Sequence, residues 1–435
     1  MSHPNPAVLE PDEVPKQPER PKLMDVMGPG LITGASDDDP SGIATYSQAG
    51  AQFGLSLGWT LVLTFPLMCA IQQISAEIGR VTGRGLAGNL RRYYPAWLLN
   101  LMVGLLIIAN TINIGADLGA MAAALRLLIQ GPLLLYVAGF AVLSVGMEVF
   151  LRYSRYVSVL KWLTLSLFAY VATVFVVGLP WGQALAALIV PHVALRAENL
   201  TVIVAIFGTT ISPYLFFWQA GEEVEDMNER PDSASLLDDP AAGPRELSRI
   251  RMDTYLGMAL SNVVALFIVW TTAATLHAHG VTNIETSEQA AEALRPIAGP
   301  FAFVVFALGI VGTGLLAVPV LAGSAAYAIG EARNWPIGLA RRPGKARAFY
   351  GTIAAATLVG ASMNFIGIDP VQALIWSAVV NGVVAVPIMA MMVLMACRAD
   401  VMGGFAIGPW LRGFGWLATA VMALAAIGMF ATWGS

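Results

Sequence analysis

Long apolar stretches run through almost the whole chain, and they constrain its fold more than any other feature. About eleven stretches of 18 residues or more are apolar enough to cross a bilayer as helices. They lie near residues 24–53, 56–80, 96–125, 131–151, 156–180, 200–221, 252–276, 299–330, 348–366, 371–397 and 413–433. Only 12% of the 435 residues are charged, against about 25% in soluble domains. The sequence therefore predicts an all-α integral membrane protein.

Lys and Arg residues fall almost entirely on one side of this helix series. The N-terminal tail and the connections after spans 2, 4, 6, 8 and 10 hold 21 of the 24, leaving Arg126, Arg196 and Arg295 on the other side. Cytoplasmic loops carry an excess of Lys and Arg. We therefore expect a multi-pass protein of the plasma (inner) membrane with a cytoplasmic N-terminus and an external C-terminus. The net charge of −4 gives no sign of a nucleic-acid partner, and nothing in the sequence indicates an oligomeric state.

Three consecutive carboxylates, Asp37, Asp38 and Asp39, lie in the middle of the first span and directly precede Pro40. An Asp at this depth costs about 2.5 to 3.5 kcal/mol on insertion scales, so acidic groups here indicate a functional site. Proline removes a helical hydrogen bond, and we expect the helix to unwind at this point. Span 6 has the same arrangement, with Pro213 after a run of small and polar residues.

Interruptions at corresponding positions of two spans indicate a transporter. Spans 1 and 6 would be the first helices of two five-helix repeats, and paired broken helices point to the binding site. Unwound backbone is tolerated at membrane depth where it lines a cavity, and its freed carbonyls can bind a cation. The expected organisation is a flexible cytoplasmic tail (1–23), a first repeat (24–180), an external loop (181–199), a second repeat (200–397) and an additional helix (413–433).

At the two breaks the sequence resembles the Nramp family of divalent-metal transporters. The family's first helix carries Asp-Pro-Gly-Asn and its sixth carries Met-Pro-His, where residues 39–42 read Asp-Pro-Ser-Gly and residues 212–214 read Ser-Pro-Tyr. The resemblance covers spans 1 to 10. It implies inverted five-helix repeats of the LeuT type, with the metal held between broken helices 1 and 6. By motif position, it implies metal binding at Asp39, at the backbone carbonyls of Ser36 and Thr209, and at the positions of Gly42 and Ser212.

Three diagnostic side chains of the family differ in this chain. Gly42 replaces the asparagine, Ser212 the methionine and Tyr214 the histidine. A thioether favours transition metals, whereas oxygen ligands suit Mg²⁺, Ca²⁺ or Mn²⁺. A roomier oxygen-only site suits Mg²⁺, which usually keeps several waters. The departure resembles the Nramp-related magnesium transporters, so we expect a secondary transporter of partly hydrated Mg²⁺, and also Mn²⁺, with no cofactor.

Proton coupling in the family uses acidic groups on helix 3 and the histidine on helix 6. Here Tyr214 stands at the histidine position, and Asp117 is the acidic residue of the helix 3 stretch that begins at Asn113. Coupling needs a chain of titratable groups. We therefore predict alternating access without proton coupling.

Further polar residues are candidates for the ion pathway or for contact through water: Asp37, Asp38, Thr210, Tyr214, Asn113, Asp117, Asn381, Glu222 and Glu223. Successive helical residues point about 100° apart, so Asp37 and Asp38 cannot both bind the same ion as Asp39. They either line the pathway or cap the second half-helix. Asn381 either contacts the hydrated ion or bonds to another helix. Glu222 and Glu223 form either an ion vestibule or a solvated helix end.

Two other transport functions fit the same pattern. A proton-coupled Mn²⁺ or Fe²⁺ symporter would have rebuilt its soft ligand elsewhere. An amino-acid symporter would share the fold, although three carboxylates at the first break would repel a substrate carboxylate. An enzyme is not expected, because the chain has no His-Glu-x-x-His motif and no Cys/His cluster.

Overall fold

The computed structural model describes residues 29–150, 165–191, 196–229, 233–339 and 341–432, and every regular element in these ranges is a helix. Nine helices there are long and apolar enough to cross a membrane, or ten if the bent pair Leu165–Val176 and Trp181–Ile189 is one span. The chain is thus a multi-pass, all-α membrane protein, as predicted. The expected tail, residues 1–23, lies outside the described residues.

Two of the predicted spans consist of two helices each. The first comprises α1 (Pro29–Asp37) and α2 (Pro40–Phe53), and the sixth comprises α10 (Ala197–Thr210) and α11 (Pro213–Glu229). Each proline is the first residue of the second helix, where its missing N–H removes no helical hydrogen bond. Both predicted interruptions are therefore confirmed.

The remaining spans are mostly single helices. They are α3 (Gly58–Thr82), α5 (Ala96–Leu128), α6 (Leu133–Phe150), α8 (Phe168–Val176), α12 (Gly243–Thr275), α15 (Ala302–Arg333), α16 (Arg347–Ser362), α17 (Pro370–Ala396) and α19 (Pro409–Ala431). Short helices connect them: α4 (Leu86–Tyr93), α9 (Trp181–Ile189), α13 (Ser287–Glu292), α14 (Arg295–Ala298) and α18 (Ala399–Met402). Single 3-10 turns are η1 (Leu165–Leu167), η2 (Pro240–Ala242), η3 (His277–His279), η4 (Gly299–Phe301), η5 (Pro343–Lys345), η6 (Met363–Ile366) and η7 (Gly403–Phe405).

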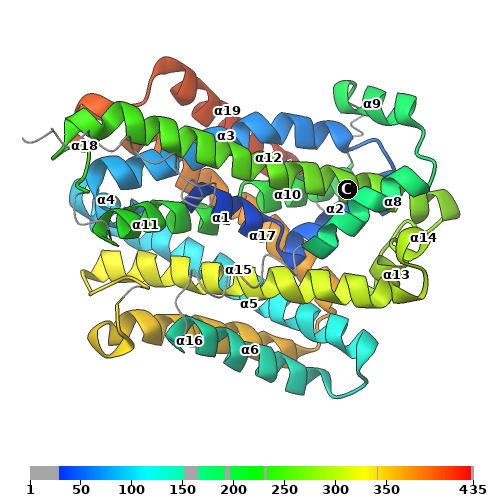
Figure 1. Ribbon diagram of the computed structural model, residues 1–435. Coiled ribbons are helices and arrows are strands. Elements are labelled where there is room, and N and C mark those ends of the chain that lie inside the picture. The colour runs from blue at the N-terminus through cyan, green and yellow to red at the C-terminus, as the bar shows by residue number, and fades with distance from the viewer. Residues whose placement is uncertain (1–28, 151–164, 192–195, 230–232, 340, 433–435) are drawn as a thin grey trace, which may run out of the picture.

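The long helices run roughly side by side, so the bundle has two ends (Figure 1). Helices α4 and α18 lie at one end, which we call the α4 end, and helices α9, α13 and α14 lie at the other, which we call the α13 end. By the distribution of Lys and Arg, the α4 end is the one expected to face the cytoplasm. Helices α1, α2, α10 and α17 occupy the middle of the bundle.

Glycines bring the broken helices close to their neighbours. Gly34 of α1 lies directly against the backbone of Gly257 on α12, and Gly208 of α10 lies against Ala378 and Gly382 on α17. At either Gly34 or Gly208 an added Cβ would overlap a backbone carbonyl oxygen. Small residues at helix interfaces let two backbones approach closely. In a bilayer, where no hydrophobic force drives helices together, van der Waals packing of this kind stabilises their association. Both breaks are thereby packed into the centre of the molecule.

The structure corrects two expectations about element boundaries. The segment 181–199, expected as an external loop, contains the helix α9 and the first residues of α10. Helix α12 begins at Gly243 rather than near residue 252. Its first turns carry Glu246 and Arg249, whose charges hide them from a search for apolar windows. The beginning of the fifth span, residues 156–164, lies outside the described residues.

Candidate cation site

Asp39 lies in the gap between α1 and α2, where its side chain caps the N-terminus of α2. One carboxylate oxygen, Oδ1, accepts hydrogen bonds from the Gly42 amide (2.7 Å) and the Ser41 hydroxyl (2.6 Å). The other, Oδ2, accepts from Asn113 Nδ2 of α5 (3.0 Å) and more weakly from the Tyr214 hydroxyl of α11 (3.4 Å). Polar groups from three helices therefore fix the orientation of one buried carboxylate.

Tyr214 joins the two broken helices. Besides its contact with Asp39, its hydroxyl donates to the Ser36 carbonyl of α1 at 3.0 Å. The Ser36 carbonyl belongs to the last turn of α1, where carbonyls have no partner within the helix. Tyr214 thus binds both of these candidate ligands, and an ion bound by Asp39 and Ser36 would lie close to its hydroxyl.

The second break approaches the first at Gly42. An added Cβ on Gly42 would lie 3.0 Å from Thr209 Oγ1, so the glycine leaves room for the end of α10. The hydroxyl of Ser212 donates to the backbone carbonyls of Gly208 (2.6 Å) and Thr209 (3.0 Å). The five positions expected from the motifs, Asp39, Ser36, Gly42, Thr209 and Ser212, are therefore brought together around one point of the bundle.

Asp37 and Asp38 face a different helix from Asp39. Asp37 Oδ2 and Asp38 Oδ1 both accept from the hydroxyl of Ser261 on α12, at 2.5 and 3.1 Å. The second oxygen of Asp37 is buried without a hydrogen-bond partner. The three carboxylates thus make hydrogen bonds on two sides of the broken helix, Asp37 and Asp38 toward α12 and Asp39 toward α5 and α11.

Several candidate residues on other helices present buried polar atoms without partners. Asp117, one turn after Asn113 on α5, has two carboxylate oxygens that make no hydrogen bond. On α17, neither the oxygen nor the nitrogen of the Asn381 side chain has a partner, and its neighbour Gly382 packs against Gly208 at the end of α10. Buried polar atoms are almost always hydrogen-bonded. Those of Asp117 and Asn381 are therefore available to bind water.

In the described ranges no positively charged side chain pairs with the carboxylates of this site. Asp37, Asp38, Asp39 and Asp117 are all at least 94% buried, and among the described residues none has a Lys, Arg or His nitrogen within 4.0 Å. A buried carboxylate without a positive partner is costly. No group of three His, Cys, Asp or Glu side chains that could hold a metal occurs in the described part of the chain.

Thr210 is next to this cluster in the chain but makes its hydrogen bond within α10, and two other candidates lie further along α11. Thr210 donates its hydroxyl to the Ile206 carbonyl of its own helix (2.9 Å). Glu222 and Glu223 come nine and ten residues after Pro213, which is about 14 to 15 Å along a helix. Glu223 is buried in an ion pair with Arg249 of α12 at 2.5 Å. The expectation of an ion vestibule at Glu222 and Glu223 therefore receives no support from the geometry of Glu223.

The site is closed toward both ends of the bundle. Asp39, Ser36, Thr209 and Ser212 are each only 1% exposed. Toward the α13 end, Gln48 of α2 accepts from the Ile284 amide in the loop before α13 (2.9 Å). Toward the α4 end, the ion pairs of Arg80 with Glu246 and of Arg249 with Glu223 join α3, α11 and α12.

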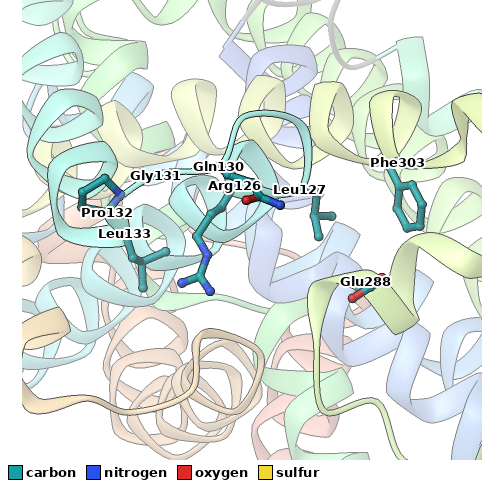
Figure 2. A pocket seen from close by; sticks show the side chains of 8 residues that line it. All are labelled: Arg126, Leu127, Gln130, Gly131, Pro132, Leu133, Glu288 and Phe303. Carbon is teal, nitrogen blue, oxygen red and sulfur yellow. The ribbon is translucent and has the colours of Figure 1, made fainter.

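A cavity of about 690 Å³ lies away from the breaks, at the α13 end, and is lined by Arg126 in the last turn of α5 and by Gln130 just after it. Figure 2 shows its lining side chains coming from the end of α5, the turn into α6, Glu288 of α13 and Phe303 of α15. It does not contain any of the carboxylates of the broken helix, so it is not the cation site.

Sequence reasoning missed two residues that hold the carboxylates. Ser41 bonds to Asp39, and its position two residues after an Asp was a signal for such a local bond. Ser261 bonds to Asp37 and Asp38 from 224 and 223 residues away, and nothing in its local sequence marks it.

Comparisons with known proteins find relatives along almost the whole chain. The sequence profile of the Nramp family, described as natural resistance-associated macrophage protein-like, matches residues 30–432. The divalent metal cation transporter MntH of Klebsiella pneumoniae subsp. pneumoniae is 26% identical over 411 residues, which cover 91% of both chains.

Solved structures with the same fold include transporters. The manganese transporter of Eremococcus coleocola superposes with a TM-score of 0.71 at 18% identity, covering 94% of this chain and 86% of that one. MhsT in complex with L-phenylalanine superposes with a TM-score of 0.60 at 13% identity, covering 93% of this chain and 98% of that one. The likeness supports the expected LeuT-type architecture.

Proposed function

The chain belongs to the Nramp family, and from this premise we propose that it carries divalent metal cations across the membrane, with partly hydrated Mg²⁺ as its main substrate and Mn²⁺ as a second. The observation that carries the proposal is the set of buried carboxylates at the first break. These have no positively charged side chain within ion-pair distance among the described residues. A cation supplies the missing charge, and its departure toward either side completes transport.

The chemistry of the donors favours a hard ion. The groups that bind Asp39 are the hydroxyls of Ser41 and Tyr214 and the amides of Gly42 and Asn113, and Ser212 stands where the family carries the methionine. Oxygen ligands suit Mg²⁺ and Mn²⁺, whereas soft sulfur ligands select transition metals. Because Mg²⁺ keeps several waters when it binds to one or two carboxylates, the unpartnered atoms of Asn381 and Asp117 would accept or donate to its water shell.

We propose further that ion movement is not coupled to protons. Tyr214 occupies the position at which the family carries a histidine, and its hydroxyl serves to hold Ser36 and Asp39. An unperturbed tyrosine titrates near pH 10, far above the range in which a histidine changes charge. Alternating access by movement of the broken helices is then sufficient for downhill flux.

A proton-coupled Mn²⁺ or Fe²⁺ symporter is the second candidate. Its Mn²⁺ cargo is favoured by the likeness to relatives that are divalent metal cation transporters and to the structure of a manganese transporter. Competition separates the two candidates, because a site with a soft ligand would bind Cd²⁺ far more tightly than Mg²⁺.

Growth of a magnesium-auxotrophic host tests the proposed substrate. We expect the wild-type protein to restore growth at low external Mg²⁺ and Asp39→Ala to abolish the rescue, since the variant lacks the carboxylate that binds the ion. Membrane levels of both proteins serve as the control. Failure of the wild type to rescue, or undiminished rescue by Asp39→Ala at equal levels, would overturn the proposal.

A further inference from the structure

A second cavity, lined by arginines, lies at the α4 end. It measures about 440 Å³ and is bounded by α4, by Val224 of α11 and by the residues that follow α15. Figure 1 shows α4, α11 and the end of α15 at the same end of the bundle. Its volume falls in the usual range of about 300 to 1,000 Å³ for small-molecule sites. It shares no residue with the cation site.

Three guanidinium groups line this cavity, from Arg84, Arg91 and Arg92. All three side chains are exposed, and in the described part of the chain none has a carboxylate oxygen within 4.0 Å. Arg91 donates to the Glu331 backbone carbonyl (3.2 Å), and Arg92 stacks on the Tyr93 ring at 5.5 Å. Most of their N–H donors therefore remain available.

The one carboxylate that lines the cavity is already bound. The two oxygens of Glu331 accept from the backbone amides of Gly85 (2.6 Å) and Gly88 (2.9 Å) at the start of α4. Glu331 thus occupies the N-terminus of α4, so this helix end offers no free amides to an anion. The positive character of the cavity comes from the arginines, which outnumber the single carboxylate.

An aromatic side chain completes the wall. Trp335, just after α15, is 39% exposed and lines the same cavity. Trp97 at the start of α5 is 66% exposed, and tryptophan is enriched at the level of the lipid headgroups. The cavity therefore opens close to the membrane interface.

We infer that this cavity binds a phosphate group, held by Arg84, Arg91 and Arg92 against Trp335. Arginine presents a planar fork of donors that matches phosphate oxygens, and several such pairs can act on one group. The interfacial position favours the phosphate of an anionic lipid headgroup over that of a soluble compound. This site is independent of the cation transported.

A binding measurement on the purified full-length protein tests the inference. A ligand that binds the folded state raises the thermal midpoint with its concentration. The probes are dihexanoyl-phosphatidylglycerol, dihexanoyl-phosphatidylcholine and inorganic pyrophosphate, each titrated at constant ionic strength in neutral detergent. We expect phosphatidylglycerol to raise the midpoint saturably at lower concentration than phosphatidylcholine. A stronger effect of pyrophosphate would assign the same phosphate site to a soluble ligand.

Two triple variants distinguish a built site from general positive charge. In Arg84→Gln/Arg91→Gln/Arg92→Gln we expect the apparent Kd for the tightest probe to rise about tenfold or more. In the control Arg342→Gln/Lys345→Gln/Arg347→Gln, which removes three exposed charges outside this cavity, we expect it to change less than about twofold. The single variant Arg84→Gln, which removes no hydrogen bond of its side chain, should raise Kd about threefold if the triple variant does not fold. Equal weakening in both triple variants, or no midpoint shift of the wild type with any probe, would overturn the inference.

Discussion

The carboxylate of Asp39 is held from two sides by groups of three helices. Ser41 and Gly42 bind one oxygen, and Asn113 and Tyr214 reach the other. A ligand that is already oriented loses little conformational freedom when an ion binds, and this raises affinity without a new contact. The same hydrogen bonds make Asp39 the most constrained of the three consecutive aspartates.

Removing the hydroxyl of Tyr214 tests this support. In Tyr214→Phe the ring still fills its site, but the Ser36 carbonyl and Asp39 each lose a donor. We expect KM for Mn²⁺ or Mg²⁺ uptake to rise about tenfold, as is typical when groups that orient metal ligands are removed. In the control Tyr350→Phe, which breaks bonds to Leu339 and Arg341 away from the site, KM should stay within about twofold. An unchanged KM in Tyr214→Phe would mean that the tyrosine does not support the ligands.

Local sequence was sufficient to find Asp39 and insufficient to find what holds it. A proline after an acidic run changes the backbone within a few residues, so the break could be located from the chain itself. Asn113 and Ser261 reach the aspartates from 74 and from more than 220 residues away. Their contribution depends on how α5 and α12 rotate in the packed bundle. Helix rotation is set by tertiary packing rather than by residue type, so the sequence placed Asn113 among several candidates and did not mark Ser261.

At the scale of elements, close helix contacts position the two breaks. Helix α10 crosses α17 where Gly208 meets Ala378 and Gly382, and the contact leaves no space for a side chain. The break between α10 and α11 follows only two residues after Gly208. Any shift of α10 away from α17 would therefore move Thr209 and the unwound backbone.

The variant Gly208→Ala tests the crossing. Inserting a methyl group into a filled interface typically costs about 1 to 3 kcal/mol, so we expect a lower thermal midpoint together with reduced uptake. Gly104→Ala on α5 is the matched control, because an added Cβ there has no atom within 4 Å and alanine favours a helix over glycine. The thermal midpoint of Gly104→Ala should be equal to or higher than that of the wild type. A wild-type midpoint in Gly208→Ala would contradict the packing described here.

Apolar pattern predicted the long helices well and the polar turns poorly. The first turns of α12 lie before the predicted span, which starts near residue 252, because charged residues such as Glu246 and Arg249 interrupt the apolar pattern there. In the fold Glu246 pairs with Arg80 of α3 and Arg249 pairs with Glu223 of α11, so the helix continues through these charges. Helix α9 was missed for a different reason: only nine residues long, it falls below the length that a membrane-span search requires.

For the whole molecule, the structure shows a conformation that is closed toward the α4 end by ion pairs. Arg249 of α12 bonds to Glu223 of α11 (2.5 Å) and to Glu246 (3.1 Å), and Arg80 of α3 lies 3.3 Å from Glu246. The two glutamates and Arg80 are less than 10% exposed. Because α11 is half of a broken span, we expect that separating it from α3 and α12 opens a route from Asp39 to this end.

Breaking this network should shift the molecule toward that open state. Removing one partner of a buried ion pair is destabilising by about 3 to 5 kcal/mol. Arg249→Met therefore destabilises the closed conformation, in which Glu223 and Glu246 lose this partner. The reporter is Ser36→Cys in a background in which Cys69 and Cys397 are replaced by Ala. In this background we expect Arg249→Met to raise the rate at which a membrane-impermeant thiol reagent reacts from the α4 side at least about tenfold. Arg295→Gln, which breaks an exposed pair with Glu292 at the α13 end, is the control and should leave the rate unchanged. An unaltered rate in Arg249→Met would exclude the network as a gate.

We propose that an oxygen-lined site passes a hydrated Mg²⁺ ion without protons. Flux into proteoliposomes with an internal pH dye measures Mg²⁺ entry and proton entry at once and so tests both parts of this claim. We predict saturable Mg²⁺ entry that Mn²⁺ inhibits, weak inhibition by Cd²⁺, no internal acidification, and loss of entry in Asp39→Ala. Strong Cd²⁺ entry with acidification, and no entry of Mg²⁺, would contradict the claim.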